Sequence, residues 1–500
     1  MPDLILSHDL GTTGDKATLF RSDGTLRAGA LAPYPTRYPK PGWAEQDAEE
    51  YWNAFCRSTR DLLAAAGCSP GEISVVSFSG QMMAALPVDR RGDPLRPSII
   101  WADQRAAAEA GELARRIPPD RIYALTGHRV SAPYSAAKIM WIRRNEPDVY
   151  RRAAKFLHAK DFVVCRLTGR MCTDYSDASG MNLLDIGALR WSEEMIAAAE
   201  ISPALLPDLH ESTAIVGTVT TEAAAASGLA EGTPVAIGGG DGACATCGAG
   251  VVSEGDAYIC LGTSAWLATA SRTPLFDPEQ KTNTFCHFVR GLYFPCGSMQ
   301  AAGGSLAWFL NAFPDGGPDR YEAMEREAAG VPAGCEGLLF LPYLMGERSP
   351  WWNPSARGSF VGLSMRHGRP HLLRAVMEGV ALNMRVIADV FRGLGREWGE
   401  IRMLGGAARS ATWRRIFADV LETPVVTLNF MEEATSLGAA IAGGVGIGLF
   451  PDIGAAARIV RAVERTEPDS ASFPAYRRMY PAFMAAYTQL LPVFEMIAEE

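Results

Sequence analysis

Residues 4–20 read LILSHDLGTTGDKATLF, and this stretch decides the fold. An apolar run leads into a turn rich in Gly and Thr at 11–14, and a second short apolar run ends at the Asp23-Gly24 turn. Two short apolar runs joined and closed by such turns predict a β-hairpin. A dinucleotide-binding fold or a P-loop would instead lead from its Gly-rich turn into a helix. We therefore expect a turn that returns into a sheet.

The same pattern recurs near the middle of the chain, where residues 256–269 read DAYICLGTSAWLAT. Residues 10–13 align with residues 261–264 at an offset of 251, which is about half of the 500 residues. Internal repeats often identify an architecture. Four residues can match by chance, but the equal spacing and the strand context favour a duplicated domain with a cleft between its halves. We place the boundary near 248–255, giving domains 1–249 and 250–500.

Other segments favour an α/β fold. Residues 401–428 read as strand, Gly-rich turn, helix and strand, with the helix over 412–421 and the second strand over 425–428. The apolar spacing predicts further helices over 51–66, 133–144 and 371–391, and a buried helix within 434–450. Strands are expected at 73–78 and 235–237.

Composition limits the function classes. The net charge of −9 argues against a nucleic-acid or anionic-membrane partner, because both need a basic face. No run approaches the roughly 20 apolar residues of a membrane-spanning helix, and residues 1–10 do not resemble a signal peptide. We therefore expect a cytoplasmic protein.

The ten cysteines lie scattered in apolar surroundings. In a large cytoplasmic protein we interpret them as reduced and mostly buried small hydrophobic residues. Cys244 and Cys247 have the spacing of a redox or zinc pair. A structural zinc site would need a second pair, and none stands at matching spacing.

The two Gly-Thr turns suit phosphate binding, because Gly lets the backbone approach closely and Thr adds a hydroxyl donor. Only the first turn follows an acid, Asp9, whose counterpart before the second turn is Cys260. An acid beside a phosphate turn suggests an intervening Mg²⁺, usually bound through water. Lys16 could neutralise phosphate charge, although an exposed strand lysine explains it equally well.

Asp241 follows three glycines at the end of an expected strand, where ligands bind in open α/β sheets. A carboxylate there could accept the proton of an attacking hydroxyl. Taken alone, an aspartate in this setting is more often a helix cap or a turn residue. The Gly405-Gly406-Ala407 turn before the 412–421 helix could let an adenosine lie flat against the backbone, but such turns often serve packing only.

Together these residues resemble the FGGY family of carbohydrate kinases, within the actin-like ATPase superfamily, and its xylulokinases in particular. The order and spacing of the motifs carry this resemblance from residue 4 to about 450. The matching segments are 9–16, 79–82, 101–105, 160–162, 166–169, 173–179, 238–241, 261–264, 358–363 with His371 and Glu378, 404–407 and 433–440.

The resemblance implies two duplicated ribonuclease-H-like domains that close on ATP-Mg²⁺ and a small sugar or polyol. It implies that Asp241 is the catalytic base and that Asp9 lies by the magnesium. A homodimer is a further expectation of the family. The remaining implied roles are phosphate contacts by Gly11, Thr12, Thr13, Lys16, Gly262, Thr263 and Ser264; adenosine contacts by Gly405, Gly406 and Ala407; and the sugar end of the cleft at Gln81, Met82, Met83, Trp101, Asp103, Arg105, Asp241 and Gly242.

Two positions depart from the xylulokinase pattern. That pattern has His where this chain has Met83, and Asn or Gln where it has Gly242. Both missing groups would hydrogen-bond sugar hydroxyls, and a site built for a hydroxyl discriminates strongly. Either the substrate is deoxy or differently substituted, or another part of the structure compensates.

The expected activity is the phosphorylation of a primary hydroxyl of a ketose or polyol by ATP, with D-xylulose as the first candidate. Alternatives are a kinase of the same family for ribulose, gluconate, glycerol, a deoxy sugar or a signalling diol, an actin-like ATPase without a sugar substrate, and a catalytically weak sensor. Intact Asp9 and Asp241 argue against the sensor.

Overall fold

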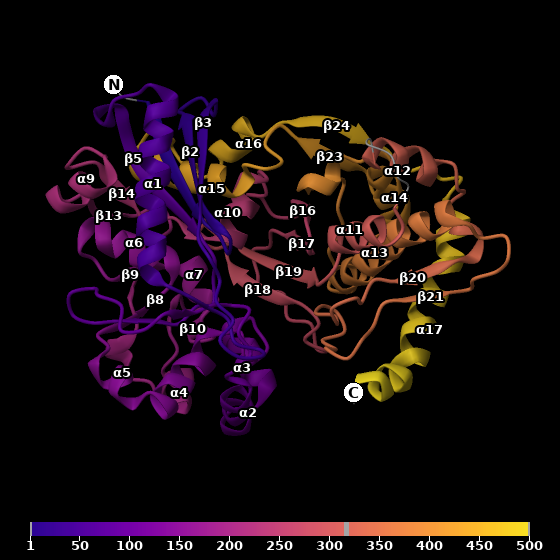
Figure 1. Ribbon diagram of the computed structural model, residues 1–500, viewed down its shortest axis with the longest axis horizontal. Helices are drawn as coiled ribbons and strands as arrows, with labels where there is room; N and C mark the ends of the chain where they lie inside the picture. Colours follow the sequence, from indigo (N-terminus) through magenta and orange to yellow (C-terminus); the bar gives the residue numbers. More distant parts are fainter. Residues whose placement is uncertain (1–2, 315–319, 499–500) are drawn as a thin grey trace.

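The computed structural model describes residues 3–314 and 320–498, and its frame is two seven-stranded sheets, one in each half of the chain (Figure 1). The first sheet contains β1 (Leu4–Leu10), β2 (Gly14–Arg21), β3 (Leu26–Pro33), β5 (Ile73–Gly80), β13 (Ile215–Thr218), β14 (Pro234–Ala236) and β15 (Gly239–Gly240). The second contains β16 (Ala257–Leu261), β17 (Ala265–Thr269), β18 (Asn283–Cys286), β19 (Tyr293–Met299), β22 (Ile401–Leu404), β23 (Val425–Leu428) and β24 (Ala462–Thr466).

Both sheets repeat one pairing scheme, which confirms the duplication expected from the two turns. In the first sheet, β1–β2 and β2–β3 are antiparallel, β1–β5 and β5–β14 are parallel, and β14–β13 is antiparallel. In the second, β16–β17 and β17–β19 are antiparallel, β16–β22 and β22–β23 are parallel, and β23–β24 is antiparallel. As expected, one Gly-Thr turn joins β1 to β2, and the other joins β16 to β17 in the equivalent hairpin of the second sheet.

Helices cover these sheets, and the helices expected from apolar spacing are all present. The first half has α1 (Ala48–Ala66), α2 (Ala107–Arg116), α3 (Pro119–Thr126), α4 (Ser135–Asn145), α5 (Pro147–Arg152), α6 (Ala159–Thr168), α7 (Tyr175–Ser179), α8 (Glu193–Ala199), α9 (Thr221–Ser227) and α10 (Asp241–Gly248). The second has α11 (Gly303–Ala312), α12 (Arg320–Ala329), α13 (Arg369–Gly393), α14 (Ala411–Leu421), α15 (Ala434–Gly446), α16 (Ala455–Ile459) and α17 (Phe473–Ala498).

Short strand pairs complete the fold. They are β4 (Glu45–Gln46) with β7 (Ser98–Ile99), β6 (Leu86–Val88) with β8 (Lys155–Leu157), β9 (Cys172–Asp174) with β12 (Asp208–His210), β10 (Leu184–Asp185) with β11 (Arg190–Trp191), and β20 (Leu339–Leu341) with β21 (Ser359–Val361). Within the described ranges, no helix combines the length and the apolar character needed to cross a membrane. All ten cysteines are unpaired and most are buried, as expected.

The two halves meet through a pair of helices. In Figure 1, α15 of the second half lies beside α10 and β5 of the first half, and α15 packs against β1 and β5. Glycines allow this close approach: a Cβ on Gly438 would lie 2.0 Å from the carbonyl oxygen of Cys244, and a Cβ on Gly248 would lie 1.7 Å from that of Ala434. The expected buried helix within 434–450 therefore packs closely against the first half.

Adding a methyl group at Gly438 should force these two helices apart. We expect Gly438→Ala to destabilise the protein by about 1–3 kcal/mol, as overpacking typically does. The thermal unfolding midpoint measures the effect. The matched control is Gly393→Ala at the end of α13, where an added Cβ meets nothing within 4 Å. Equal midpoints for the two variants would contradict this role of Gly438.

Candidate active site

Two carboxylates lie together at the ends of three neighbouring strands. Strand β5 pairs in parallel with β1 on one side and with β15 on the other, so Ser79 lies level with both Asp9 and Gly239. The Ser79 hydroxyl donates to Asp9 Oδ1 at 2.8 Å. Asp241 follows β15 directly as the first residue of α10. The carboxyl ends of parallel strands are where such sheets bind ligands.

A glycine makes this arrangement possible. Strands β14 and β15 run along the same edge of β5 and are interrupted at Gly238, which has a φ of +65°. A Cβ there would lie 1.8 Å from the carbonyl oxygen of Phe78. The chain can therefore approach the edge of β5 closely at Gly238, and it places Asp241 just beyond the end of the strand.

Both carboxyls have raised pKa values. The Asp241 side chain is exposed to solvent, yet the protein atoms around it reduce its solvation and raise its pKa to about 7, and the negative charge of Asp9 adds to the effect. Burial also raises the pKa of Asp9 to about 6, against the opposing hydrogen bond from Ser79. In both carboxyls loss of solvation is the larger cause, and a nearby cation would favour their charged forms.

Side chains from several elements brace the first turn. Gln46 Nε2 donates to the carbonyl oxygen of Thr12 at 2.6 Å, and Gln81 Nε2 donates to that of Gly11 at 3.3 Å. Trp101 Nε1 donates to Thr12 Oγ1 at 2.9 Å. Gln81 is almost fully buried, so the structure places it beneath the turn and not in open space at the sugar end.

Lys16 crosses to the second half of the chain. Its Nζ donates to the carbonyl oxygen of Glu432 at 3.1 Å and lies 3.6 Å from Glu433 Oε1. Contact between Lys16 and a phosphate would require this link to open. The phosphate role of Lys16 stays a prediction, and the structure adds an inter-half link that sequence reasoning missed.

The second turn sits on the start of α11. The backbone N–H of Gly303 donates to the carbonyl oxygen of Gly262 at 2.8 Å, and that of Gly304 donates to Thr263 O at 2.9 Å. A Cβ on Gly303 would lie 2.5 Å from Gly262 O, so only glycine fits there. Burial raises the pKa of Cys260 to about 12, which leaves this turn without the acid that Asp9 supplies to the first.

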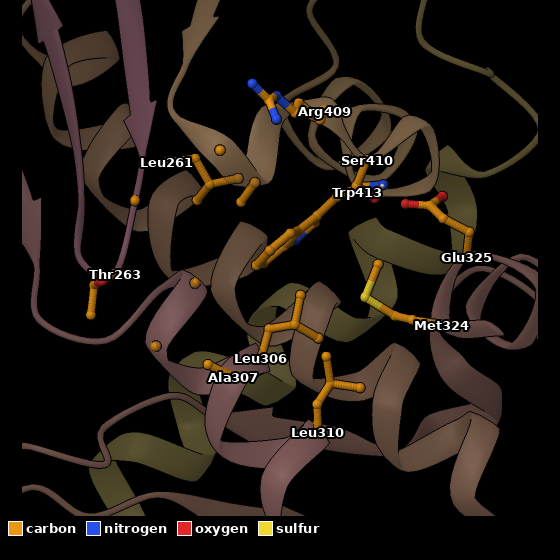
Figure 2. Close-up of a pocket in the computed structure, with 15 residues that line it drawn as sticks. Leu261, Thr263, Leu306, Ala307, Leu310, Met324, Glu325, Arg409, Ser410 and Trp413 are labelled. Atoms are coloured by element: carbon orange, nitrogen blue, oxygen red, sulfur yellow. Dashed lines mark hydrogen bonds between the residues drawn. The ribbon is translucent and has the colours of Figure 1, made fainter. Parts of the chain in front are cut away.

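A pocket of about 680 Å³ opens beside the second turn (Figure 2). It brings Gly262 and Thr263 together with Gly406 and Ala407, two sequence regions expected to bind one nucleotide. Gly405 lies just behind, with a φ of +89° and space for no Cβ, because one would lie 2.6 Å from Leu261 O.

Most of this pocket wall was not expected from the sequence. Figure 2 shows Trp413 reaching across the pocket above Leu306 and Leu310. The further lining residues are Leu261, Gly303, Gly304, Leu306, Ala307, Leu310, Met324, Glu325, Arg409, Ser410 and Trp413. Apolar side chains at helical spacing on α11 and α14 look like ordinary core residues, so no local signal marks them.

The expected sugar end is largely apolar. Met82 lies against Gly240, where a Cβ would meet its Sδ at 2.7 Å. Met83 has a left-handed backbone with a φ of +65°. The ring of Phe294, from β19 of the second half, would lie 3.3 Å from a Cβ on Gly242. An aromatic ring therefore stands beside the position where the resembling family carries a polar side chain.

Asp103 and Arg105 lie beneath the surface of this region. Arg105 Nη2 lies 2.7 Å from Asp103 Oδ2, and both of these side chains are buried. Arg105 Nη1 lies 2.7 Å from Glu45 Oε1. The Arg105 guanidinium also stacks 3.6 Å from the Trp43 ring centre. These two residues therefore support the loop that carries Trp101, while Trp101 itself is exposed.

Lys138 is a further support that sequence reasoning missed. Its buried Nζ donates to the carbonyl oxygens of Met83 at 2.8 Å and Ile100 at 2.6 Å, which ties the two segments of the sugar end together. Burial lowers the pKa of Lys138 to about 7. A lysine in an amphipathic helix is usually exposed, so the sequence offers no sign of this role.

Paired acids at the strand ends, a phosphate-type turn on each side and a nucleotide-sized pocket define a kinase that acts on a small molecule. The chain belongs to the FGGY family of carbohydrate kinases, whose N-terminal domain matches residues 4–248 and whose C-terminal domain matches residues 257–447. It is an ATP-dependent carbohydrate kinase with the two-domain fold of that family.

Individual relatives match over nearly the whole chain. The chain is similar to the xylulose kinase of Escherichia coli (strain K12), with 33% identity covering 98% of this chain and 100% of that protein. It is also similar to the gluconokinase of Bacillus subtilis (strain 168), with 31% identity covering 100% and 98%. The crystal structure of xylulose kinase from Rhodospirillum rubrum matches with a TM-score of 0.90 and 33% identity, covering 98% and 100%.

The raised pKa of Asp241 predicts a pH dependence. If Asp241 is the base that the family resemblance implies, kcat/KM for the sugar should fall about tenfold per pH unit below a pH of about 7, because the protonated carboxyl cannot accept a proton. Above a pH of about 7, kcat/KM should become independent of pH. Steady-state rates between about pH 5.5 and 8.5 measure this, and a profile flat across the range would contradict the assignment.

Proposed function

We propose that this kinase phosphorylates a primary hydroxyl of a small ketose or polyol, with D-xylulose as first substrate, to give D-xylulose 5-phosphate and ADP. The observation that carries the chemistry is the carboxyl of Asp241, which stands at the strand ends with a raised pKa. The substrate class rests on the similarity to xylulose kinases along the whole chain.

In this proposal Asp241 is the base. The sugar hydroxyl oxygen attacks the γ-phosphorus of ATP while its proton passes to an Asp241 carboxylate oxygen, and ADP leaves as the bond to the β-phosphate oxygen breaks. Phosphoryl transfer requires mainly positioning and charge stabilisation. The backbone amides and hydroxyls of the two turns supply both, with the adenosine in the pocket beside Gly406 and Ala407.

Magnesium fits beside the first turn. Carboxylate oxygen is a ligand that Mg²⁺ accepts, and the Asp9 carboxyl lies at the strand ends beside the first turn, where Ser79 donates to one of its two oxygens. When bound, the ion would offset the charge of the phosphates. Asp9 would hold it, most simply through water.

We further propose that residues 1–249 and 250–500 act as two bodies that close over both substrates. Closure would exclude water and so prevent futile hydrolysis of ATP. The link from Lys16 to Glu432 and Glu433 and the packing of α15 on the first sheet lie across this boundary. Assembly as a homodimer is part of the same proposal, and analytical ultracentrifugation tests it.

The main alternative is that the substrate is a sugar acid such as gluconate, or a sugar other than D-xylulose. The similarity to a gluconokinase is as extensive as that to xylulose kinases. The apolar surroundings of Met83 and Gly242 also suit a substrate with fewer hydroxyls at that end, because a hydroxyl left without a partner there would lose affinity.

Removing the proposed base tests the mechanism. We expect Asp241→Ala to lower kcat by about 10²–10⁴-fold, the usual contribution of a general base. ADP binding, measured by calorimetry, should stay unchanged, because the nucleotide pocket lies beside the second turn. Asp148→Ala on exposed α5 is the control and should keep full activity. Near-normal transfer by Asp241→Ala would overturn the proposal.

A substrate panel tests the specificity. A coupled assay of ADP release should show turnover with D-xylulose, and Met83→His with Gly242→Asn should raise kcat/KM for it if the substrate is normally less hydroxylated. Histidine is tolerated at positive φ better than most residues, which suits position 83. The asparagine requires the Phe294 ring to shift slightly.

The panel should include ribulose, gluconate, glycerol and deoxy sugars. If the double variant does not improve xylulose turnover, the deoxy-substrate alternative loses its support. ATP hydrolysis that no sugar stimulates would instead favour an actin-like ATPase.

A further inference from the structure

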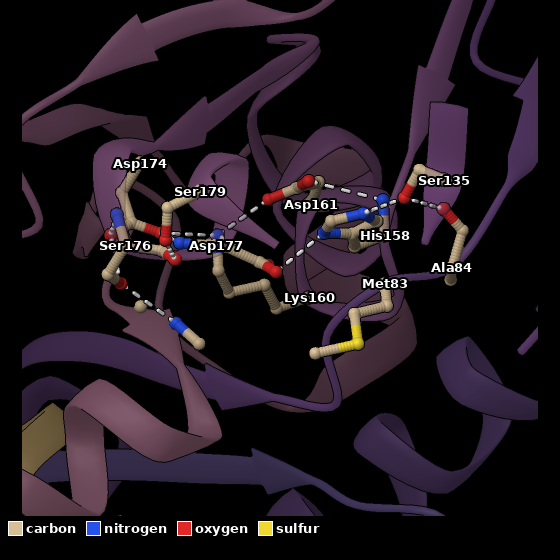
Figure 3. A network of polar contacts seen from close by, with 12 residues as sticks. Met83, Ala84, Ser135, His158, Lys160, Asp161, Asp174, Ser176, Asp177 and Ser179 are labelled. Atoms are coloured by element: carbon tan, nitrogen blue, oxygen red, sulfur yellow. Dashed lines mark hydrogen bonds and ion pairs between the residues drawn. The ribbon is translucent and has the colours of Figure 1, made fainter. Parts of the chain in front are cut away.

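A network of buried charges lies behind the proposed base (Figure 3). Lys160 Nζ lies 2.6 Å from Asp161 Oδ1, 3.1 Å from Asp174 Oδ1 and 3.3 Å from Asp177 Oδ2. His158 Nδ1 lies 2.6 Å from Asp177 Oδ1. All five side chains are almost fully buried. None of them was assigned a role from the sequence.

This cluster is an internal ion-pair network and not a metal site. His158, Asp161 and Asp177 have the spacing of metal ligands, but the Lys160 ammonium already occupies the space among the carboxylates. Despite burial, which acts in the opposite direction, the aspartates raise the pKa of Lys160 well above its usual value. The lysine therefore stays charged and holds the cluster together.

The network reaches the proposed base through one serine. Ser176 Oγ donates to Asp174 Oδ2 at 2.5 Å and accepts from the backbone N–H of Gly240 at 3.1 Å. Gly240 is the N-cap residue of α10 and directly precedes Asp241. The backbone of β15 is thus connected to the charged cluster by hydrogen bonds through the Ser176 hydroxyl.

This hydrogen bond adds to the parallel pairing of β15 with β5 and to the contact of Cys244 Sγ with the carbonyl oxygen of Gly239. The strand is two residues long, and both are glycines without side chains to pack. Neither glycine has room for a side chain, since a Cβ on Gly239 would lie 2.2 Å from the Phe288 ring and 2.6 Å from Ser176 Oγ, and one on Gly240 would lie 2.7 Å from Met82 Sδ. Ser176 therefore stands where a small displacement would move the base.

We propose that Ser176, anchored by the Lys160–Asp174 ion pair, is the positioning residue that fixes Asp241 for proton transfer. This inference rests on the proposed role of Asp241 as base. Ser176 does not touch the substrates; it acts through the Gly240 peptide. Misplacing a catalytic group by about 1 Å can cost on the order of 100-fold in rate, so one backbone contact can have a large effect on kcat.

The fold offers a matched control. Ser212 is also buried, and its Oγ donates to the same oxygen, Asp174 Oδ2, at 2.7 Å. Its backbone carbonyl accepts from the N–H of Gly238, and alanine would keep that contact. Ser176→Ala and Ser212→Ala therefore remove the same kind of hydrogen bond to Asp174, but only the first removes the acceptor of Gly240.

The test compares kcat, both KM values and thermal midpoints of the two full-length variants. We expect Ser176→Ala to lower kcat about tenfold or more while KM for ATP stays within about twofold, and Ser212→Ala to keep kcat within about twofold, at similar midpoints. Ser176→Cys is the second variant, because a thiol fills the space but accepts hydrogen bonds weakly. It should also lose kcat.

Equal kcat losses for Ser176→Ala and Ser212→Ala would overturn the inference, since they would show only a common structural effect. Asp241→Ala, assayed alongside, separates this failure from failure of the proposed function. If Asp241→Ala abolishes transfer and the two serine variants behave alike, the base assignment stands and the role of Ser176 falls. If Asp241→Ala keeps near-normal activity, both fall.

Discussion

The rest of the site depends on the parallel pairing of β5 with β1 on one side and with β15 on the other. This pairing places Asp9 and Asp241 on either side of Ser79, close enough for the charge of one to raise the pKa of the other. Two like charges held together in partial burial are costly unless a cation or a proton relieves them. The fold accepts this cost at the point where, in the proposed reaction, a metal-bound phosphate and the proton of a sugar hydroxyl would arrive.

The duplicated halves are alike in topology but differ in chemistry. Both sheets follow one pairing scheme, and both turn between equivalent strands at a Gly-Thr sequence. The first turn has Asp9 beside it, and side chains such as Gln46 and Trp101 brace it. The second has a neutral Cys260 and is packed on α11, next to an apolar pocket. Duplication thus gives two turns of the same design in different surroundings, with a carboxyl beside the first and an apolar pocket beside the second.

Two buried lysines show how the fold supports the site from behind. Lys138 bridges the carbonyl groups of the two segments at the sugar end, and Lys160 neutralises the aspartates behind α10. Lys160 stays charged, and its bonds to the aspartates are charge-assisted in a region of low dielectric, where such bonds are strong. Burial lowers the pKa of Lys138 to about 7, and this lysine acts by donating to two backbone carbonyls. A lysine in a sequence gives no sign of this use, because its exposure depends on residues distant along the chain.

The sequence by itself determined the two hairpins, several of the longer helices such as those over 51–66 and 371–391, the acid before the first turn, and the glycines that precede Asp241. These follow from local rules, since turn chemistry and apolar periodicity act over a few residues. Only the tertiary structure decided that Asp103 and Arg105 support a loop from beneath, that Lys16 links the halves, and that Ser176 meets the Gly240 peptide. Apart from the ion pair between Asp103 and Arg105 themselves, these contacts join residues from tens to hundreds of positions apart, as between Arg105 and Glu45. Their energies depend on burial, which no local pattern encodes.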